Sequence, residues 1–451
     1  MIRLAARDIP VLLKTDVLVC GGGPGGTAAA LAAAREGARV TIIERYNHLG
    51  GLATGGLVLV LPHFIDNGRQ TIGGLGLEQR ERMREVGEAW EHNRHQPQDD
   101  SVYFEPEALK WISLKLCADA GVQILHHCWL SGAITDDDGT PDTLVGPDSD
   151  APGKSVGPDI DAPDKSVGRT AVRGVIFESK AGRMAALGKV VIDATGDGDV
   201  FAWAGAEFEK SNQAIGLPFR VGGLDIQRWM AWTKEHQEES AAIWNGVKDE
   251  VGWPSPMFYI SGMNEERGTG WGNNFYIEAD GLDPLVLSDI EVNARLKIWD
   301  ALQLLKSKLP GWEKAWLIDT ACQLGVRRSR RLKGLYQLQE SETSQVDFRH
   351  PDAIGRGNDF RKRDLSYDIP YGTLVPEKLD GLLTCGRCLS CTHEALEPIR
   401  EIHVCWVSGE GAGLAGAMAV AQGIQPREVS VPDLQAKLRA ANVAFAQDYP
   451  G

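Results

Sequence analysis

The first forty-five residues alternate between continuously apolar runs and a stretch of small residues. Residues 17–20 form a short apolar run of the kind that makes a buried strand. The alanine-rich stretch from Thr27 to Arg35 predicts a helix able to pack closely on a sheet, and Gly37 ends it. Residues 40–43 are again apolar and predict a second, parallel strand. The order strand, helix, strand predicts a βαβ unit.

The same patterns predict further elements along the chain. Helices are predicted at 78–91, 105–120, 225–247, 288–309, 406–421 and 434–445. Strands are predicted at 122–134, 171–179, 184–192, 256–260, 274–278 and 382–385. The strands at 171–192 suggest a small antiparallel meander, and 382–385 suggests a last parallel strand. The fold class is therefore α/β.

One segment interrupts this pattern. Residues 145–155 are repeated almost unchanged as 156–166, and both copies are rich in Pro, Gly, Asp and Ser. Such a segment has little to bury, so we predict an extended or disordered surface loop within an insertion at 135–168. Its aspartates lack the spacing and the terminal Glu of an EF-hand, so no metal site is predicted.

The turn after the first strand carries candidate chemistry. Gly21, Gly23 and Gly26 fit G-x-G-x-x-G, followed by the helix, the second strand and Glu44 about 20 residues later. Gly21 permits the tight turn, Gly23 lets the backbone approach a pyrophosphate, and Gly26 lets helix and strand touch. The helix N-terminus offers free N–H groups to phosphates. Glu44 suits a free ribose 2′-hydroxyl, so the pattern favours FAD or NAD over NADP.

Three later motifs decide between these dinucleotides. They are Leu49-Gly50-Gly51-Leu52-Ala53-Thr54, Asp193-Ala194-Thr195-Gly196-Asp197-Gly198-Asp199, and Gly386-Arg387-Cys388 followed by Thr392-His393-Glu394-Ala395 and Arg400. With the glycine turn they resemble the FAD-dependent oxidoreductases of the glutathione-reductase superfamily. The resemblance implies a two-dinucleotide-domain (Rossmann-like) FAD-binding fold, with an antiparallel meander and a second, α+β substrate domain.

The resemblance also implies a set of FAD contacts. They are Gly21, Gly23, Pro24, Gly25, Gly26, Glu44, Arg45, Gly50, Gly51, Thr54, Trp129, Thr195, Gly196, Gly386, Arg387, Gly411 and Ala412. Asp197 or Asp199 would cap the helix from Val200. The FAD-binding domain would be discontinuous, at 1–60, 105–204 and 369–451. Residues 61–104 and 205–368 would form the substrate domain, whose tryptophans would mostly fill its core.

Two clusters are candidates for the reaction itself. His393, Glu394 and Arg400 would lie near the flavin, where a histidine can take a proton from an alcohol or amine. His393 equally suits a structural hydrogen bond. The turn Gly325-Val326-Arg327-Arg328-Ser329-Arg330-Arg331 resembles a family motif but has Arg328 in place of an acid. Arg327 and Arg330 match the motif. Two interpretations stay open: the arginines contact substrate or flavin, or the turn docks onto acidic neighbours.

Composition limits the alternatives. The net charge of −15 disfavours nucleic acid and anionic membranes as partners. The eight cysteines are too sparse for a disulfide scaffold, and no signal peptide or membrane span is predicted, so we expect a cytoplasmic protein. Cys388 and Cys391 form a C-x-x-C, and such a dithiol could pass electrons to flavin or supply half of a zinc site; no second pair has metal-ligand spacing, so zinc is not predicted.

These patterns predict an FAD-dependent oxidoreductase, an oxidase or dehydrogenase. It would transfer a hydride between a small-molecule substrate of alcohol, amine or glycoside type and flavin N5. The alternatives are a monooxygenase that uses NAD(P)H, a dithiol–flavin reductase that uses Cys388 and Cys391, and a non-enzymatic flavin-binding or RNA-associated protein. Assembly into homo-oligomers stays open.

Overall fold

The computed structural model describes residues 8–66, 68–91, 100–136, 169–362 and 365–448. The duplicated segment at 145–166 lies outside these ranges, so the predicted surface loop stays a prediction. The same holds for nearly all of the insertion predicted at 135–168.

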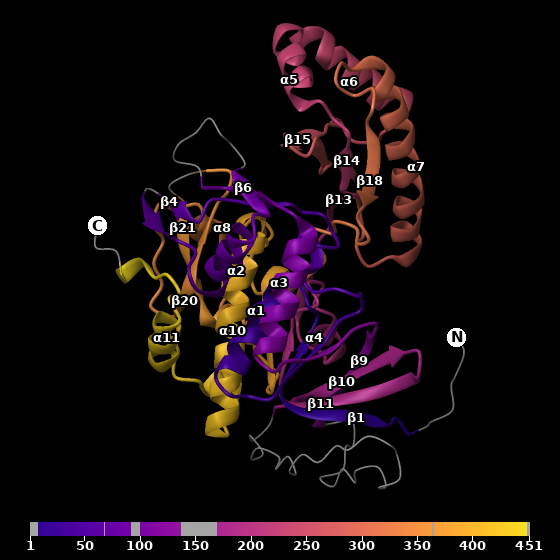
Figure 1. Ribbon diagram of the computed structural model, residues 1–451. Coiled ribbons are helices and arrows are strands. Elements are labelled where there is room, and N and C mark those ends of the chain that lie inside the picture. The colour runs from indigo at the N-terminus through magenta and orange to yellow at the C-terminus, as the bar shows by residue number, and fades with distance from the viewer. Residues whose placement is uncertain (1–7, 67, 92–99, 137–168, 363–364, 449–451) are drawn as a thin grey trace.

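A seven-stranded mixed sheet is the centre of the larger part of the molecule (Figure 1). Its strands are β1 (Val11–Cys20), β2 (Val40–Ile43), β8 (Gln123–Leu125), β9 (Trp129–Thr135), β10 (Val172–Ser179), β11 (Gly182–Asp193) and β22 (Leu382–Thr384). The order is β8-β2-β1-β11-β10-β9, and β22 also pairs with β11. The pairs among β8, β2, β1, β11 and β22 are parallel, whereas β10 is antiparallel to both β11 and β9. The predicted βαβ unit and meander are therefore both present.

Each face of this sheet buries its own hydrophobic cluster. Val17 and Val19 of β1 point into one cluster, and Leu18 and Cys20 point into the other. Because side chains alternate along a strand, a strand covered on both faces must be apolar at every position. This requirement explains the unbroken apolar run at 17–20.

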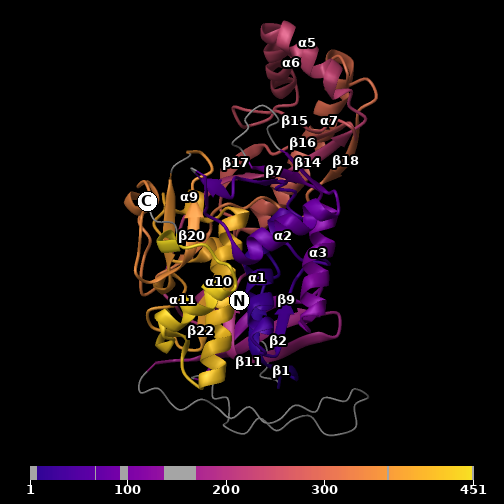
Figure 2. The same cartoon turned by 60° about the vertical axis from the view of Figure 1, so that its left-hand side comes forward.

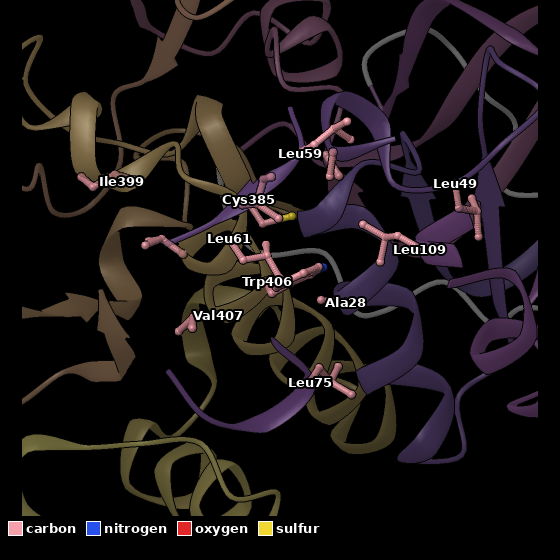
Figure 3. Packing of buried hydrophobic residues seen from close by; sticks show 14 of the residues in the cluster. Ala28, Leu49, Leu59, Leu61, Leu75, Leu109, Cys385, Ile399, Trp406 and Val407 are labelled. Atoms are coloured by element: carbon pink, nitrogen blue, oxygen red, sulfur yellow. The ribbon is translucent and has the colours of Figure 1, made fainter. Parts of the chain in front are cut away.

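Helices cover the first face. They are α1 (Pro24–Arg35), α2 (Gly74–Glu85), α3 (Pro106–Asp119) and α10 (Ile402–Gln422). Figure 3 shows Ala28 of α1, Leu75 of α2, Leu109 of α3 and Trp406 of α10 in this cluster. A Cβ at Gly409 or Gly413 of α10 would overlap the carbonyl oxygens of Gly25 or Ala29 in α1. The small residues thus let the two central helices lie in backbone contact. The short helix α4 (Asp199–Trp203) lies beside β9 and β11, and its Phe201 belongs to the second cluster.

A second lobe projects from this body in both views (Figures 1 and 2). It contains α5 (Ile226–Glu235), α6 (Gln237–Glu250), α7 (Pro284–Lys308), β13 (Gln213–Gly216), β14 (Phe219–Gly222), β15 (Ser261–Asn264), β16 (Thr269–Gly272), β17 (Phe275–Ala279) and β18 (Trp316–Thr320). Its four-stranded sheet has the order β15-β16-β14-β18, and β13 pairs with β17. Trp312 is in ring contact with Trp229 and Trp244, at centroid distances of 5.0 and 5.8 Å. These three tryptophans fill the core of the lobe, as predicted.

The remaining shorter elements lie outside the seven-stranded sheet and its covering helices and outside the lobe. They are β3 (Val60–Leu61), β4 (Ile65–Asp66), β5 (Arg69–Gln70), β6 (Ala89–Glu91), β7 (Val102–Phe104), β12 (Phe208–Lys210), β19 (Arg330–Leu332), α8 (Glu340–Thr343), β20 (Ala353–Asn358), β21 (Ser366–Pro370), α9 (Leu396–Ile399) and α11 (Val431–Ala440). β20 packs against α10 and α11 and so belongs to the part of the molecule that contains the large sheet. The exact domain boundaries stay a prediction.

Several predicted elements were displaced. Residues 225–247 form two helices that meet at His236, and 256–260 contain no strand. The last long helix begins at Ile402, four residues before its predicted start at 406. Helix α4 has Gly198 at its N-cap with φ +66° and no side-chain cap, so the cap predicted at Asp197 or Asp199 was wrong. The first turn of α4 is held instead by the carboxylate of Asp193, which accepts a hydrogen bond from the N–H of Phe201 at 3.0 Å.

By length and composition α10 would be able to cross a membrane, yet 89% of its most apolar window is buried inside the protein. Its apolar sequence is therefore explained by its position between the large sheet, α1 and β20.

Candidate active site

The carboxyl ends of four parallel strands meet at one edge of the large sheet. The last residue of β1, Cys20, is in register with the last residues of β2 and β11. The last residue of β22 is in register with that of β11. The residues that follow, Gly21, Glu44, Ala194 and Cys385, all line one cavity of about 720 Å³. Ligands of open α/β sheets bind at this edge.

The glycine turn forms one wall of the cavity. Gly21 adopts φ +103°, and a Cβ on it would lie 2.5 Å from the Ala194 carbonyl oxygen. A Cβ at Gly26 would overlap the Gly21 carbonyl oxygen, so strand and helix are in contact there. Gly23, Pro24 and Gly25 line the cavity at the N-terminus of α1, where the first N–H groups have no helical partner. This wall is suited to an anion.

Glu44 fixes the turn from the side of β2. Its buried carboxylate accepts hydrogen bonds from the backbone N–H of Gly22 at 2.6 Å and of Tyr46 at 2.8 Å. Arg45 also lines the cavity, with its guanidinium 5.2 Å from the ring centroid of Trp129. Trp129 lies on the same wall and is half exposed.

Asp193, at the end of β11, organises the next loop. Its carboxylate accepts hydrogen bonds from the N–H and hydroxyl of Thr195 and from the N–H of Phe201. Burial raises the pKa of Asp193 to about 6. Asp193 thus provides the support that the sequence assigned to Asp199. Asp199 instead forms an ion pair with Arg330 at 2.8 Å. Thr195 and Gly196 line the cavity beside this support.

The turn after β22 completes this part of the wall. Gly386 and Arg387 line the cavity, and the Arg387 guanidinium pairs with Asp197 at 2.9 Å. Gly51 lines it as well. In all, twelve of the predicted FAD contacts and the predicted catalytic Arg400 lie on the wall: Gly21, Gly23, Pro24, Gly25, Glu44, Arg45, Gly51, Trp129, Thr195, Gly196, Gly386, Arg387 and Arg400.

The remaining predicted FAD contacts are not on the wall. Gly26 lies in the strand–helix contact, and Gly50 and Thr54 stabilise their own turn, where the Thr54 hydroxyl donates to the Leu49 carbonyl at 2.7 Å. Gly411 and Ala412 are buried near the middle of α10, Gly411 beside Ile354. Because α10 begins at Ile402, it is Ile402 and Cys405 of its first turn that line the cavity.

His393 and Glu394 are also away from the cavity wall. The Nε2 atom of His393 is hydrogen-bonded to Arg328, and burial together with that cation lowers the pKa of His393. Glu394 is exposed. A ring nitrogen that accepts a bond from a guanidinium is occupied, so the structural reading of His393 is the one that the geometry supports. Of the three predicted catalytic residues, only Arg400 lines the cavity.

The two cysteines of the C-x-x-C motif lie in different surroundings. Cys388 belongs to the smaller of the two hydrophobic clusters, and Cys391 to the larger one. Both are free thiols, and burial raises the pKa of each, that of Cys391 to about 12. Neither lines the cavity. Thiols that stay protonated and inaccessible are poor redox partners, so this geometry disfavours the dithiol alternative.

The second wall of the cavity comes from residues distant in sequence. We use this name for Tyr259, Trp271, Asn273, Phe275, Gln323, Arg327, Phe360 and Arg361. His63 lines the cavity too, and it is the one histidine that does so in the described part of the chain. Apart from Arg327, no local motif marks this wall, because its members come from separate turns and strands that the fold brings together.

Comparisons with known proteins agree with this arrangement. The family model for FAD dependent oxidoreductases matches residues 16–438. The chain belongs to that family. A soluble pyridine nucleotide transhydrogenase of Serratia proteamaculans is 54% identical over 39 residues, which are 9% of this chain and only 8% of that relative.

Solved structures show distant likeness along most of the chain. A geranylgeranyl bacteriochlorophyll reductase-like protein from Thermoplasma acidophilum is 16% identical with a TM-score of 0.42, covering 95% of this chain and 83% of its own. The p-nitrophenol 4-monooxygenase PnpA from Pseudomonas putida DLL-E4 is 12% identical with a TM-score of 0.46, covering 97% and 91%.

The cofactor of the family, FAD, fits the cavity. A Cβ at Gly23 would meet no atom within 4 Å, so the backbone there is open to a ligand. The N-terminus of α1 would hold the pyrophosphate, and Glu44, which lines the cavity at the end of β2, would lie beside a ribose. The cavity lies within the size range of cofactor sites. The protein is thus an FAD-dependent oxidoreductase.

Proposed function

We propose that the protein oxidises a small molecule of alcohol, amine or glycoside type in this cavity. One observation supports the proposal: the glycine turn, the Thr195–Gly196 loop and the second wall all line the same space. Bound FAD supplies the acceptor of a hydride at N5. An alcohol that loses a hydride and a proton becomes a carbonyl compound, and the electron pair leaves to oxygen or another acceptor.

His63 is our candidate for the base in place of His393. It is buried on the cavity wall, and its backbone carbonyl accepts a hydrogen bond from the amide of Asn358 at 2.8 Å. Asn358 in turn bonds the ring of His403 at 2.7 Å, at the start of α10. This network holds the segment around His63 against α10. An imidazole in this place would take the proton that an alcohol or amine loses with its hydride.

Arg400 would supply a positive charge. It pairs with Glu397 at 2.9 Å and lies 3.5 Å from Glu401, and these carboxylates raise its pKa although burial opposes them. A cation fixed by two carboxylates is preorganised, so it would stabilise negative charge that develops in the cavity without reorganising.

The test is an anaerobic screen of alcohols, amines and glycosides against the purified protein, read as loss of flavin absorbance. Bleaching by one class of organic substrate would support the proposal. Bleaching by NAD(P)H alone, followed by oxygen consumption with an aromatic substrate, would replace it by the monooxygenase alternative. A protein that binds FAD and is bleached by neither would point to the non-enzymatic alternative.

A further inference from the structure

Four arginines occur in the turn at 327–331, and one of them differs from the rest. Arg328 pairs with Glu397 at 2.7 Å, Arg330 with Asp199 at 2.8 Å, and Arg331 with Glu209 at 2.9 Å. Arg327 has no carboxylate within 4.0 Å among the described residues, and its side chain is buried on the second wall. A buried cation without an anion is costly, so the position suggests a ligand.

The surroundings of Arg327 hold it in one orientation. Its Nη1 donates to the carbonyl oxygens of Ala214 at 3.0 Å and Gly325 at 3.4 Å. The guanidinium carbon lies 4.1 Å from the centroid of the Phe275 ring. In the described part of the chain, its Nε and Nη2 make no hydrogen bond. These two atoms form one edge of the guanidinium, the geometry that binds a carboxylate through two parallel hydrogen bonds.

The charges around this turn do not balance. Glu397 and Glu401 are the acidic groups whose charges act most on Arg327, yet Glu397 is shared by Arg328 and Arg400, and Glu401 lies against Arg400. Three guanidinium groups therefore face two carboxylates. Burial and the neighbouring Arg400 lower the pKa of Arg327 to about 10, so it still carries its charge at neutral pH. This group of side chains is therefore one negative charge short of neutrality.

The rest of the second wall is apolar or neutral near this cation. Tyr259, Phe275 and Phe360 are each partly exposed, and Asn273 and Gln323 offer amides. Arg361 also lies there, but it already pairs with Asp359 at 2.7 Å. A ligand that fits would bear one carboxylate for Arg327 and an apolar or aromatic part for the rings.

We propose that the substrate is a carboxylic acid, which Arg327 binds through its carboxylate while the alcohol or amine of the same molecule is oxidised. The oxidation step of this inference rests on the proposed function, whereas the binding of a carboxylate by Arg327 does not. Arg327 would be a specificity-determining residue. The charges of the FAD pyrophosphate would be met elsewhere, at the N-terminus of α1.

The experiment uses FAD-loaded protein and pairs of probes that differ only in charge: phenylacetate and phenylacetamide, benzoate and benzamide. Binding is measured by titration calorimetry and by the change in flavin absorbance. We expect at least one acid to bind about tenfold or more tightly than its amide, as a lost charge-assisted hydrogen bond implies. Arg327→Gln should abolish this preference, and Arg327→Lys should restore part of it. The matched control is Arg228→Gln in the lobe, where Arg228 pairs with Glu313 at 3.0 Å and does not line the cavity. This variant should change the preference by less than about threefold, because an exposed ion pair away from the cavity contributes little to binding there.

Two results would overturn the inference. Amides that bind as tightly as their acids to the unmutated protein would show that no carboxylate site exists, whether or not the variants fold. Loss of FAD or a lowered flavin reduction potential in Arg327→Gln, with the acid preference intact, would assign Arg327 to the cofactor. Preferential binding of acids by a protein that no organic substrate reduces would support the carboxylate site while refuting the proposed oxidation.

Discussion

Replacing Gly26 by alanine should reduce the stability of the fold, whereas replacing Gly23 by alanine should reduce FAD binding. Gly26 lies inside α1, where a Cβ would overlap the Gly21 carbonyl oxygen and lie 3.0 Å from the Ala194 Cβ. The backbone of β1 and the loop after β11 would have to move. Alanine favours a helix by roughly 1 kcal/mol over glycine, but overpacking against backbone costs about 1–3 kcal/mol. Since no side chain can rotate to relieve this overlap, we expect Gly26→Ala to lower the free energy of unfolding of the apoprotein.

Gly23 is the matched control. It has φ −67° in extended backbone, and a Cβ there would meet no protein atom within 4 Å. Gly23→Ala should therefore leave the free energy of unfolding of the apoprotein within about 0.5 kcal/mol of wild type. The methyl group would project into the cavity, so FAD affinity should fall about tenfold, and the carboxylate of Gly23→Asp should remove the yellow colour altogether.

Urea unfolding of FAD-free protein and fluorescence titration with FAD separate the two effects. An apoprotein of Gly26→Ala as stable as wild type would refute the strand–helix contact. A Gly23→Ala protein that binds FAD normally would refute the position assigned to the pyrophosphate.

Three further predictions concern other parts of the chain. His63→Ala should slow anaerobic reduction of the flavin by roughly a hundredfold or more, whereas His393→Ala should change it little; equal rates in both would exclude His63 as the base. Deleting Val156–Ser166 should leave flavin content and melting temperature nearly unchanged, since long surface loops contribute little; failure to fold would show a packed element. Burial raises the pKa of Glu410 to about 8 from 4.5. The folded protein keeps a proton that the unfolded chain releases, so the free energy of unfolding should fall as pH rises through this window. Glu410→Gln should reduce that fall, and an identical pH profile would contradict the assignment.

The sequence by itself determined the glycine-rich half of the cavity wall, where it predicted the FAD contacts. The glycine turn, Glu44, Thr195, Gly196, Gly386 and Arg387 each follow the end of a parallel strand. The contacts of such motifs are made largely by backbone at a fixed distance from a strand end, so local sequence is enough to place them. Parallel pairing then brings the strand ends to one edge of the sheet, so the position of these motifs around the cavity follows from the strand order alone.

Only the tertiary structure decided which side chains form the rest of the cavity wall. His393 is close in sequence to the flavin motif, yet its direction is fixed by Arg328, a residue of another turn. His63, Asn273 and Arg327 share one cavity although more than two hundred residues separate the first from the others. Cys388 and Cys391 are neighbours in the chain, but packing directs them into two different hydrophobic clusters. Side-chain direction and the absence of a partner for a charge depend on contacts between distant segments, which no local pattern records.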